Sequence, residues 1–497
     1  MSTKYIPTIG LEIHAELATK SKMFCSCANN PDEEKVNVNI CPVCMGQPGT
    51  LPVLNKEAIK HVLKAGLAVG GTIADFTEWD RKNYFYPDIP KGYQISQYKY
   101  PLVEGGSVLA GGNTVTITRI HLEEDTAQST HDTHEKSLVN YNRAGVPLME
   151  LVTEPVIHDA ATAVAFAKEL QLLLRYLGVG EANLEKGEMR VEANISVATE
   201  EDTVAGKFGT KTEVKNLNSF RAVERAIAYE IARQTKIAEK IALGQTDEKV
   251  VQETRGWDEG AGKTFSQRAK ESSHDYRYFP EPDIPKMKLR EIPEFDIETL
   301  RTNLPELPWT LRNRFVKEFM MTEKEAAMFT DTPELSKYFE SILAGISGAK
   351  PELKTVRLVI NYLSSDYVGL LKKQFGEEHF ITHISDVSPA NFAALINLVV
   401  NGKVNSRGAK DTLGLMMKDP SGDPEVIATQ NGFIQKNDEG ALKGMILEII
   451  TANPTVVEDY KKGKVVALQF LIGQGMKMTK GSSNPEMLKK LFLESIK

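Results

Sequence analysis

The pattern of apolar residues changes once along this chain, and that change limits the folds the chain can adopt. Residues 1–290 contain alternating stretches such as 114–120 and 189–197, and a period of two is typical of strands with one buried face. Helical spacing occurs among them at residues 56–69, 160–177 and 221–243. Because these strands and helices follow one another without a regular βαβ repeat, the sequence predicts an α+β fold rather than a doubly wound sheet.

A stretch rich in proline and acidic residues, from Tyr278 to Glu294, marks the end of this mixed region. Helical patterns dominate after it, and the last segment has a clear helix start, with Ser388 as N-cap and Pro389 in the first turn. A chain of 497 residues with 41% hydrophobic composition can bury several cores. We therefore expect three domains, at residues 1–292, 293–386 and 387–497.

Charge gives the molecule no general attraction to nucleic acids or anionic membranes, because the formal net charge is −7. Residues 386–497 nevertheless carry 14 Lys and Arg against 12 Asp and Glu. Lysines gather there at Lys461, Lys462, Lys464, Lys477 and Lys480. They form either a solvated face or a contact for an RNA backbone.

The N-terminus has neither the basic region nor the apolar run of a signal peptide. No apolar stretch approaches the roughly 18 residues of a membrane span. We expect a soluble cytoplasmic protein that does not contact a membrane.

The four cysteines fall in two close pairs, Cys25-x-Cys27 and Cys41-x2-Cys44. In a reducing compartment such pairs favour a tetrahedral zinc site over disulfides. The first pair is tighter than the usual C-x2-C spacing, and free thiols or a redox pair are the alternatives. A metal held by four sulfurs would be closed to substrate, so we expect a structural Zn²⁺.

The run from Asp80 to Gln97, DRKNYFYPDIPKGYQISQ, crowds cations among aromatic residues. Pro87 and Pro90 exclude a regular helix and an uninterrupted central strand. Cations can contact phosphate there and aromatic rings can stack on a base. The candidates for binding ATP or substrate are Arg81, Tyr84, Tyr86 and Tyr93, with Lys82 and Lys91 beside them. We interpret the run as an ordered loop that forms a site; an ordinary surface loop is the alternative.

Carboxylates and imidazoles recur at three places in the mixed region. Glu12 and His14 lie two residues apart on an alternating run, so both side chains point to one face of a strand. The segment His121–Asp125 follows the alternating stretch 114–120, where side chains can reach a site at the strand end. Glu150 lies in a mostly apolar run and needs a cationic partner if it is buried.

If these groups converge, oxygen ligands with one imidazole suit Mg²⁺ better than Zn²⁺, and the metal could neutralise bound phosphates. A simple salt bridge from Glu150 to Arg143 or Arg119 is the alternative.

The sequence contains neither a P-loop for nucleotide binding nor a site with a Ser or Cys nucleophile. Gly260–Thr264 resembles the end of a P-loop, but Trp257 stands where that motif requires a glycine. The chain also has no nucleophile elbow, and its cysteines are accounted for by the metal site. If the chemistry consumes ammonia, this chain has to receive it from elsewhere.

Several long runs of the sequence point to one known family. They are Ile9–His14, Asp80–Gln97, His121–Asp125, Phe208–Phe220, Asp275–Pro285 and the tail Val387–Lys497. They resemble the B subunit of the aspartyl/glutamyl-tRNA amidotransferase, and the resemblance spans nearly the whole chain. The implied fold is a catalytic cradle domain, residues 1–292, followed by a helical domain and a YqeY-like tail that grip tRNA.

The resemblance implies a heterotrimer with an amidase-type A subunit, which hydrolyses glutamine, and a small C subunit. The B subunit would use Mg-ATP to phosphorylate the side-chain carboxylate of Glu-tRNA(Gln) or Asp-tRNA(Asn), and channelled ammonia would then displace phosphate. This is the activity of a ligase that forms carbon–nitrogen bonds with glutamine as the nitrogen donor. The choice between the two tRNAs stays open, because it depends on the synthetases of the cell.

The resemblance also implies roles for individual residues. The expected magnesium ligands are Glu12, His14, Glu124 and Glu150. Glu124 is further expected to act in catalysis together with Lys82 and Lys91, the two lysines lying along the site wall and the ammonia path. The cysteine pairs occur in only some members of the family, which supports a stapling metal. The alternative from another class is a zinc-stapled module that presents tRNA without chemistry of its own, and the carboxylate cluster argues against it.

Overall fold

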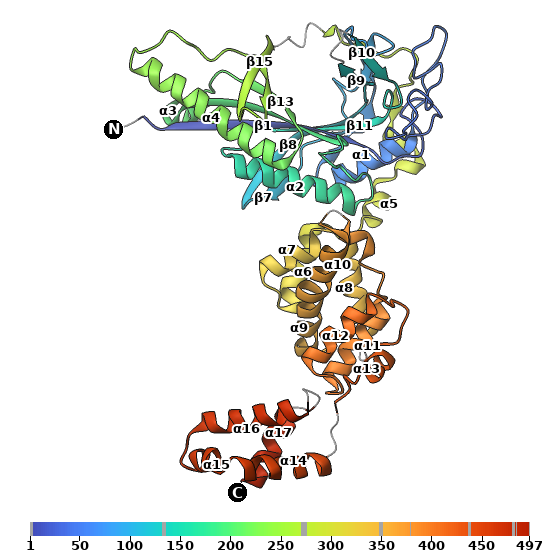
Figure 1. The fold of residues 1–497 in the computed structure, drawn as a ribbon. Coiled ribbons are helices and arrows are strands. Elements are labelled where there is room, and N and C mark those ends of the chain that lie inside the picture. Colours follow the sequence, from blue (N-terminus) through green and yellow to red (C-terminus); the bar gives the residue numbers. More distant parts are fainter. Residues whose placement is uncertain are drawn as a thin grey trace. The chain divides into compact units, whose positions relative to one another are not determined.

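The computed structural model describes residues 3–131, 136–269, 276–346, 351–377, 379–435, 439–479, 483 and 485–496. The chain forms two compact units, Met1–Pro308 and Trp309–Lys497 (Figure 1). The first combines strands and helices and the second is helical, as the sequence predicts. The three-domain division at residues 292 and 387 stays a prediction. None of the described helices is long and apolar enough to cross a membrane.

The first unit is built on a sheet that has ten strands within the described residues. In spatial order they are β15 (Lys263–Ala269), β14 (Glu253–Asp258), β13 (Thr212–Leu217), β12 (Met189–Thr199), β1 (Tyr5–Glu16), β11 (Pro147–Thr153), β8 (Asn113–Glu124), β6 (Val103–Glu104) and β2 (Thr72–Ile73), with β7 (Ser107–Ala110) also on β8. The pairs are antiparallel except β13 with β14. This arrangement confirms the mixed α and β character predicted for the region.

Helices cover one face of this sheet (Figure 1). They are α1 (Lys56–Ala68), α2 (Ala160–Tyr176) and α4 (Phe220–Ala242), with the short α3 (Glu200–Val204) and α5 (Ile297–Thr302) elsewhere in the unit. The alternation of β1 explains the two faces of the sheet. Ile9, Leu11 and Ile13 are fully buried, whereas Glu12 and His14 point to the opposite, polar face.

The run Asp80–Gln97 is a hairpin rather than a loop alone. Strands β4 (Asp80–Asn83) and β5 (Tyr93–Ser96) pair with each other, and β16 (Phe279–Pro280) pairs with β4. Pro87 and Pro90 both lie in the connection between the strands, where their missing N–H groups cost no ladder hydrogen bond. The remaining short strands are β3 (Phe76–Thr77), β9 (Gln128–His131), β10 (Ser137–Asn140) and β17 (Met287–Lys288).

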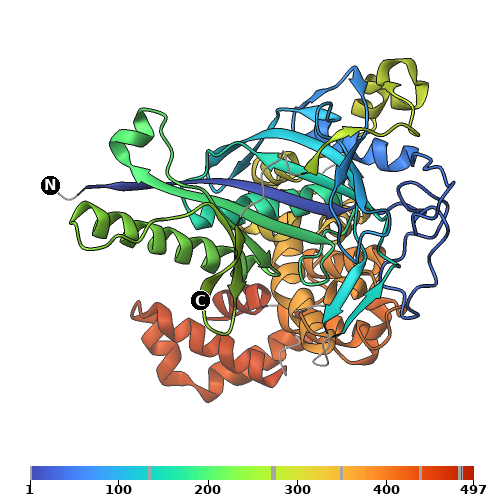
Figure 2. The ribbon, with the colours of Figure 1, turned by 90° about the horizontal axis from the view of Figure 1, so that it is seen from above.

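Two irregular segments complete the first unit. Residues 17–55, which hold the four cysteines, form a lobe of irregular chain at one end of the sheet (Figure 2). The P-loop-like segment Gly260–Thr264 begins in the turn between β14 and β15, where Gly262 N donates to Asp258 O at 2.8 Å. It belongs to a hairpin turn and not to a P-loop.

The second unit consists of helices. They are α6 (Pro308–Phe319), α7 (Glu323–Thr330), α8 (Pro333–Gly345), α9 (Leu353–Asn361), α10 (Val368–Phe375), α11 (Pro389–Val400), α12 (Ser406–Met416), α13 (Pro424–Gln430), α14 (Glu439–Ala452), α15 (Pro454–Lys461), α16 (Val465–Met478) and α17 (Pro485–Ser495). The predicted helix start is confirmed, because Ser388 Oγ accepts a hydrogen bond from Asn391 N at 3.1 Å.

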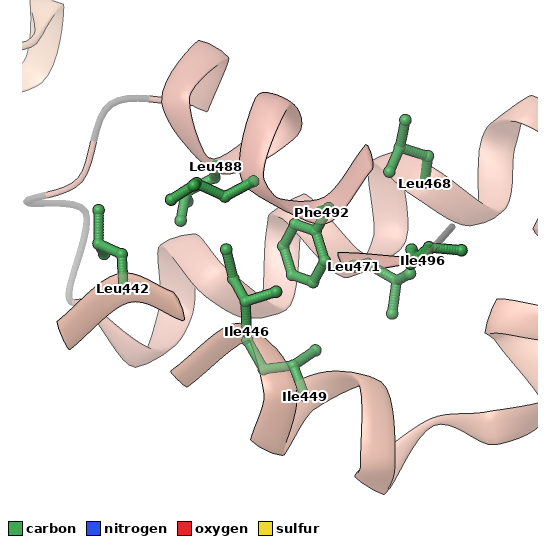
Figure 3. Close-up of a cluster of buried hydrophobic side chains, with 9 residues drawn as sticks. Leu442, Ile446, Ile449, Leu468, Leu471, Leu488, Phe492 and Ile496 are labelled. Atoms are coloured by element: carbon green, nitrogen blue, oxygen red, sulfur yellow. The ribbon is translucent and has the colours of Figure 1, made fainter. Parts of the chain in front are cut away.

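The last four helices share a hydrophobic core of their own, in which Ile446, Leu471, Leu488 and Phe492 are buried (Figure 3). The clustered lysines of this region lie on or beside α15 and α16 and are exposed, except that Lys480 falls outside the described residues.

Candidate active site

A row of carboxylates and imidazoles crosses three neighbouring strands, β1, β11 and β8. In the antiparallel register His14 lies opposite Glu150, and Glu150 lies opposite His121. Residues directly opposed on antiparallel strands share a face and lie about 5 Å apart, so these side chains meet. Glu12 and Glu123 extend the row, because each lies two residues along its strand from one of the imidazoles.

The imidazoles of this row contact its carboxylates. Glu150 Oε2 lies 3.4 Å from His14 Nε2 and 3.2 Å from His121 Nε2. Burial opposes ionisation of Glu150, but His121 and His14 hold its pKa well below the ordinary value. Burial acts to lower the pKa of His14, yet the hydrogen bond and charge of Glu150 raise it to about 9. Burial and then the charge of Glu150 raise the pKa of Glu12 to about 7.

The donor atoms of this row fit a divalent cation. Two groups, Glu12 with His14 and Glu150, and His121 with Glu123 and Glu150, each place their donor atoms within 4.8 Å of one another. Glu123 is 2% exposed, and its Oε2 has no hydrogen-bond partner among the described residues. A buried carboxylate oxygen without a partner is costly, and a cation would satisfy it. Carboxylates with imidazole form a donor set that can hold Mg²⁺.

Glu124, which the sequence analysis placed in this cluster, lies on the opposite face of β8. Its Oε1 is 2.6 Å from Lys91 Nζ and accepts a hydrogen bond from Ile95 N at 2.9 Å. Neighbouring residues of a strand point to opposite faces, so the structure brings Glu123 to the row and not Glu124.

A bulge in β8 contributes to this outcome. The register with β11 shifts between Val152 and Thr153 and skips Thr118. Because an extra residue inverts the face to which every later side chain points, the alternation seen in 114–117 does not continue to the strand end. One signal in the sequence could have identified Glu123, since its two-residue spacing from His121 matches that of Glu12 and His14.

A cavity of about 350 Å³ lies over the row, and we call it the inner cavity. Its cations and tyrosines include Lys82, Arg119, Lys215, Tyr98, Tyr276 and Tyr278. Burial acts to lower the pKa of Lys82, but the charge of Glu123 and its neighbours raise it, so Lys82 remains an ammonium. Lys82 Nζ lies 5.1 Å from the ring centre of Tyr276. The inner cavity therefore combines anionic ligands with fixed cations.

Of the two arginines predicted as salt-bridge partners of Glu150, only Arg119 lies near it. Arg119 Nη2 lies 4.0 Å from Glu150 Oε1, at the limit of an ion pair. Arg143 instead pairs with Asp125 at 3.4 Å. Neither arginine replaces the imidazoles as the near neighbour of Glu150.

A separate cavity of about 230 Å³, which we call the rear cavity, contains the Lys91–Glu124 pair. Arg81 and Tyr93 also line it, and the Arg81 guanidinium lies 4.2 Å from the ring centre of Tyr93 while Nε contacts Glu281 at 2.6 Å. The other two residues predicted to bind ATP or substrate, Tyr84 and Tyr86, line an outer cavity that adjoins the inner one. The four candidates are therefore divided between two places.

The four cysteines converge as the sequence predicts. The four Sγ atoms lie within 4.8 Å of one another, and none of the cysteines forms a disulfide; the residues are Cys25, Cys27, Cys41 and Cys44. A hydrogen bond from Cys25 lowers the pKa of Cys44 to about 5, and the ammonium of the fully buried Lys22, 4.0 Å from the same sulfur, adds to the effect. Four convergent sulfurs fit Zn²⁺ and leave no position open to substrate.

Comparison with known proteins gives matches along nearly the whole chain. The model of the GatB/GatE catalytic domain matches residues 7–292, and that of the GatB domain matches residues 337–496. The B subunit of the aspartyl/glutamyl-tRNA(Asn/Gln) amidotransferase of Caldicellulosiruptor saccharolyticus is 41% identical over 498 residues, which cover 99% of both chains. The protein of the same description from Thermus thermophilus is 41% identical over 492 residues, again 99% of both chains.

Proposed function

The chain belongs to the family of aspartyl/glutamyl-tRNA(Asn/Gln) amidotransferase B subunits, and we propose that its first unit activates the side-chain carboxylate of Glu-tRNA(Gln) or Asp-tRNA(Asn) for amidation. A carboxylate is a poor acyl donor because oxide is a poor leaving group. Transfer of a phosphoryl group from ATP supplies a better one, and ammonia then displaces phosphate to give the amide.

The observation that carries this proposal is the pair of donor groups that share Glu150 beneath the inner cavity, Glu12 with His14 on one side and His121 with Glu123 on the other. These residues would hold Mg²⁺, which when bound neutralises phosphate charge and orients the transferred group. Glu123 replaces Glu124 in the proposed ligand set, because Glu123 groups with His121 and Glu150 as possible metal ligands and its Oε2 has no hydrogen-bond partner among the described residues.

The cations of the inner cavity have a complementary role. Lys82 is placed beside Glu123 and Tyr276, and its raised pKa keeps it charged. Charge spread over a transferring phosphoryl group is stabilised by fixed ammonium groups, so Lys82 would stabilise the transition state, with Arg119 and Lys215 along the same wall.

We propose that the rear cavity receives ammonia. The activated carboxylate would hydrolyse if water reached it freely, so the nucleophile needs an enclosed route. The ion pair of Lys91 and Glu124 lies in this cavity and would line the route of ammonia. The Zn²⁺ proposed for the four cysteines would be structural, because four sulfurs leave it no open position. It would hold the wall of this cavity, to which Cys25 and Cys44 belong.

The family also supplies the expected partners. Ammonia would come from an amidase-type A subunit, with a small C subunit completing a heterotrimer, and the protein would act in the cytoplasm with the rest of translation. The lysines of α15 and α16 would contact the tRNA backbone.

The substitution Glu150→Gln tests the proposed function in the assembled complex. It keeps the size of the side chain but removes a charge that Mg²⁺ needs, so tRNA-dependent ATP hydrolysis should fall by roughly a hundredfold or more. Glutamine hydrolysis by the amidase-type partner should persist, and added ammonium should not restore amidation, because the lost step precedes attack by ammonia. Rescue by ammonium would instead place Glu150 on the ammonia route. Unchanged ATP hydrolysis would refute the metal assignment.

A further inference from the structure

The outer cavity has a volume of about 800 Å³ and adjoins the inner cavity. The two share the side chains of Lys82, Lys215, Thr254 and Tyr276. Its other walls come from the connection between β4 and β5 and from β15. A group that lies in the outer cavity can therefore extend directly toward the carboxylate row.

Two aromatic rings in this cavity remain open to solvent. Tyr86 is 62% exposed and Phe265 is 42% exposed. Neither forms a ring pair within the part of the chain that the structure describes, whereas Tyr84 packs edge-to-face on Tyr276 at 6.0 Å. Exposed aromatic faces beside a site are suited to stacking on a planar base.

The position of Phe265 depends on a glycine across the hairpin. Gly256 on β14 pairs with Phe265 on β15, and a Cβ at Gly256 would lie 2.6 Å from Phe265 Cζ. The absence of a side chain at Gly256 thus lets the ring lie over the neighbouring strand. If Phe265 served only to cover Gly256, an apolar side chain of similar size would be sufficient. Stacking on a base requires the aromatic ring, so the substitution Phe265→Leu distinguishes the two roles.

We infer that the outer cavity binds the 3′-terminal nucleoside of the aminoacyl-tRNA, with Tyr86 and Phe265 as its stacking faces. This inference rests on the proposed function. The amino acid is esterified to the terminal ribose, so that ribose has to lie one amino-acid length from the carboxylate row while the body of the tRNA stays outside. The outer cavity occupies that place, between the open surface and the inner cavity.

The side chains of the two cavities favour ATP phosphates in the inner cavity and the 3′-terminal nucleoside of the tRNA in the outer one. The inner cavity brings Lys82, Arg119 and Lys215 to the proposed metal ligands, as a triphosphate requires. The outer cavity shares Lys82 and Lys215 with it and adds Asp88, Ser266, Gln267 and the exposed rings of Tyr86 and Phe265. The exposed rings suit a base, and the polar side chains suit a ribose.

The test uses the assembled amidotransferase and tRNA carrying 2-aminopurine in place of the 3′-terminal adenine. Stacking should quench the fluorescence of the probe when wild-type protein binds. Tyr86→Leu and Phe265→Leu, which keep apolar volume but remove the ring, should reduce the quenching and raise KM for aminoacyl-tRNA about fivefold or more, with KM for ATP changed less than twofold. Phe208→Leu is the matched control, because Phe208 is 57% exposed and lines neither cavity.

Three outcomes would overturn the inference. These are a rise of KM for ATP without a change for tRNA, wild-type quenching that persists in both leucine variants, and a wild-type complex that amidates tRNA without quenching the probe. The last result leaves the proposed function intact. Conversely, ring-dependent quenching in a complex that hydrolyses no ATP would support the binding site while refuting the proposed function.

Discussion

At the scale of single residues, the neighbours Glu123 and Glu124 should have different functions because they point to opposite faces of β8. Glu123→Gln removes a proposed metal ligand, so tRNA-dependent ATP hydrolysis should fall by about a hundredfold and ammonium should not rescue amidation. Glu124→Gln removes the charge that pairs with Lys91. It should leave ATP hydrolysis within a few fold of wild type and reduce glutamine-dependent amidation. Steady-state assays of the two variants with glutamine and with ammonium measure both effects, and equal losses of ATP hydrolysis would contradict the assignment.

This pair also shows how far sequence reasoning reaches at one position. Alternation identified Glu12 and His14 as neighbours on one face, and the structure places both beside Glu150. Which of two adjacent glutamates joins them depends on a bulge at Thr118, and a bulge is set by pairing with β11, which is distant in sequence. The four predicted binding residues are divided between two cavities, because Arg81 and Tyr93 lie on β4 and β5 whereas Tyr84 and Tyr86 lie in the connection between them.

At the scale of elements, the cysteine lobe is the part whose order should depend most on a bound ion. Residues 17–55, all of which the structure describes, form no helix and only a single β-bridge, between Ser21 and Ala28. The lobe nevertheless packs closely on the rear cavity, since a Cβ at Gly46 would lie 2.6 Å from Lys91 Cγ. The lobe thus has little secondary structure to hold this position by itself.

We expect one Zn²⁺ per chain after purification under reducing conditions, measured by atomic absorption. Cys41→Ser should lose the metal and, because the lobe lines the rear cavity, lower glutamine-dependent amidation more than tRNA-dependent ATP hydrolysis. Ser26→Ala is the control, since Ser26 is exposed between two of the cysteines and supplies no sulfur. Wild-type protein without zinc, or full zinc in Cys41→Ser, would contradict the proposal.

Regular elements followed from local patterns more reliably than the irregular ones. The three predicted helices of the first unit appear within a residue of their expected bounds, because apolar periodicity and N-caps such as Asp159 act locally. The strands at the two ends of the Asp80–Gln97 run were not predicted. They pair with each other across the proline-containing connection, and β16, nearly two hundred residues away in sequence, adds a third strand beside β4.

At the scale of the whole molecule, the last four helices can be separated from the rest of the second unit without opening a core. Phe392 on α11 packs against Tyr338 and Tyr367, so a cut before Val387 would remove a buried ring from its partners. Helices α14–α17 instead have a core of their own. A cut after Gln435 therefore tests tRNA binding with less risk of unfolding the remaining helices.

Residues 436–497 carry ten lysines against seven acidic residues, and we expect their removal to weaken tRNA binding by the assembled complex. The loss should be mainly electrostatic, so the dependence of log affinity on log salt concentration should become shallower by about one unit for each lysine–phosphate contact removed. Binding of ATP should not change, because all residues of the inner cavity lie in the first unit. Filter binding over a salt series measures the effect. If the truncated complex binds tRNA as tightly and with the same salt dependence as the full one, the tail has a role other than contacting the RNA backbone.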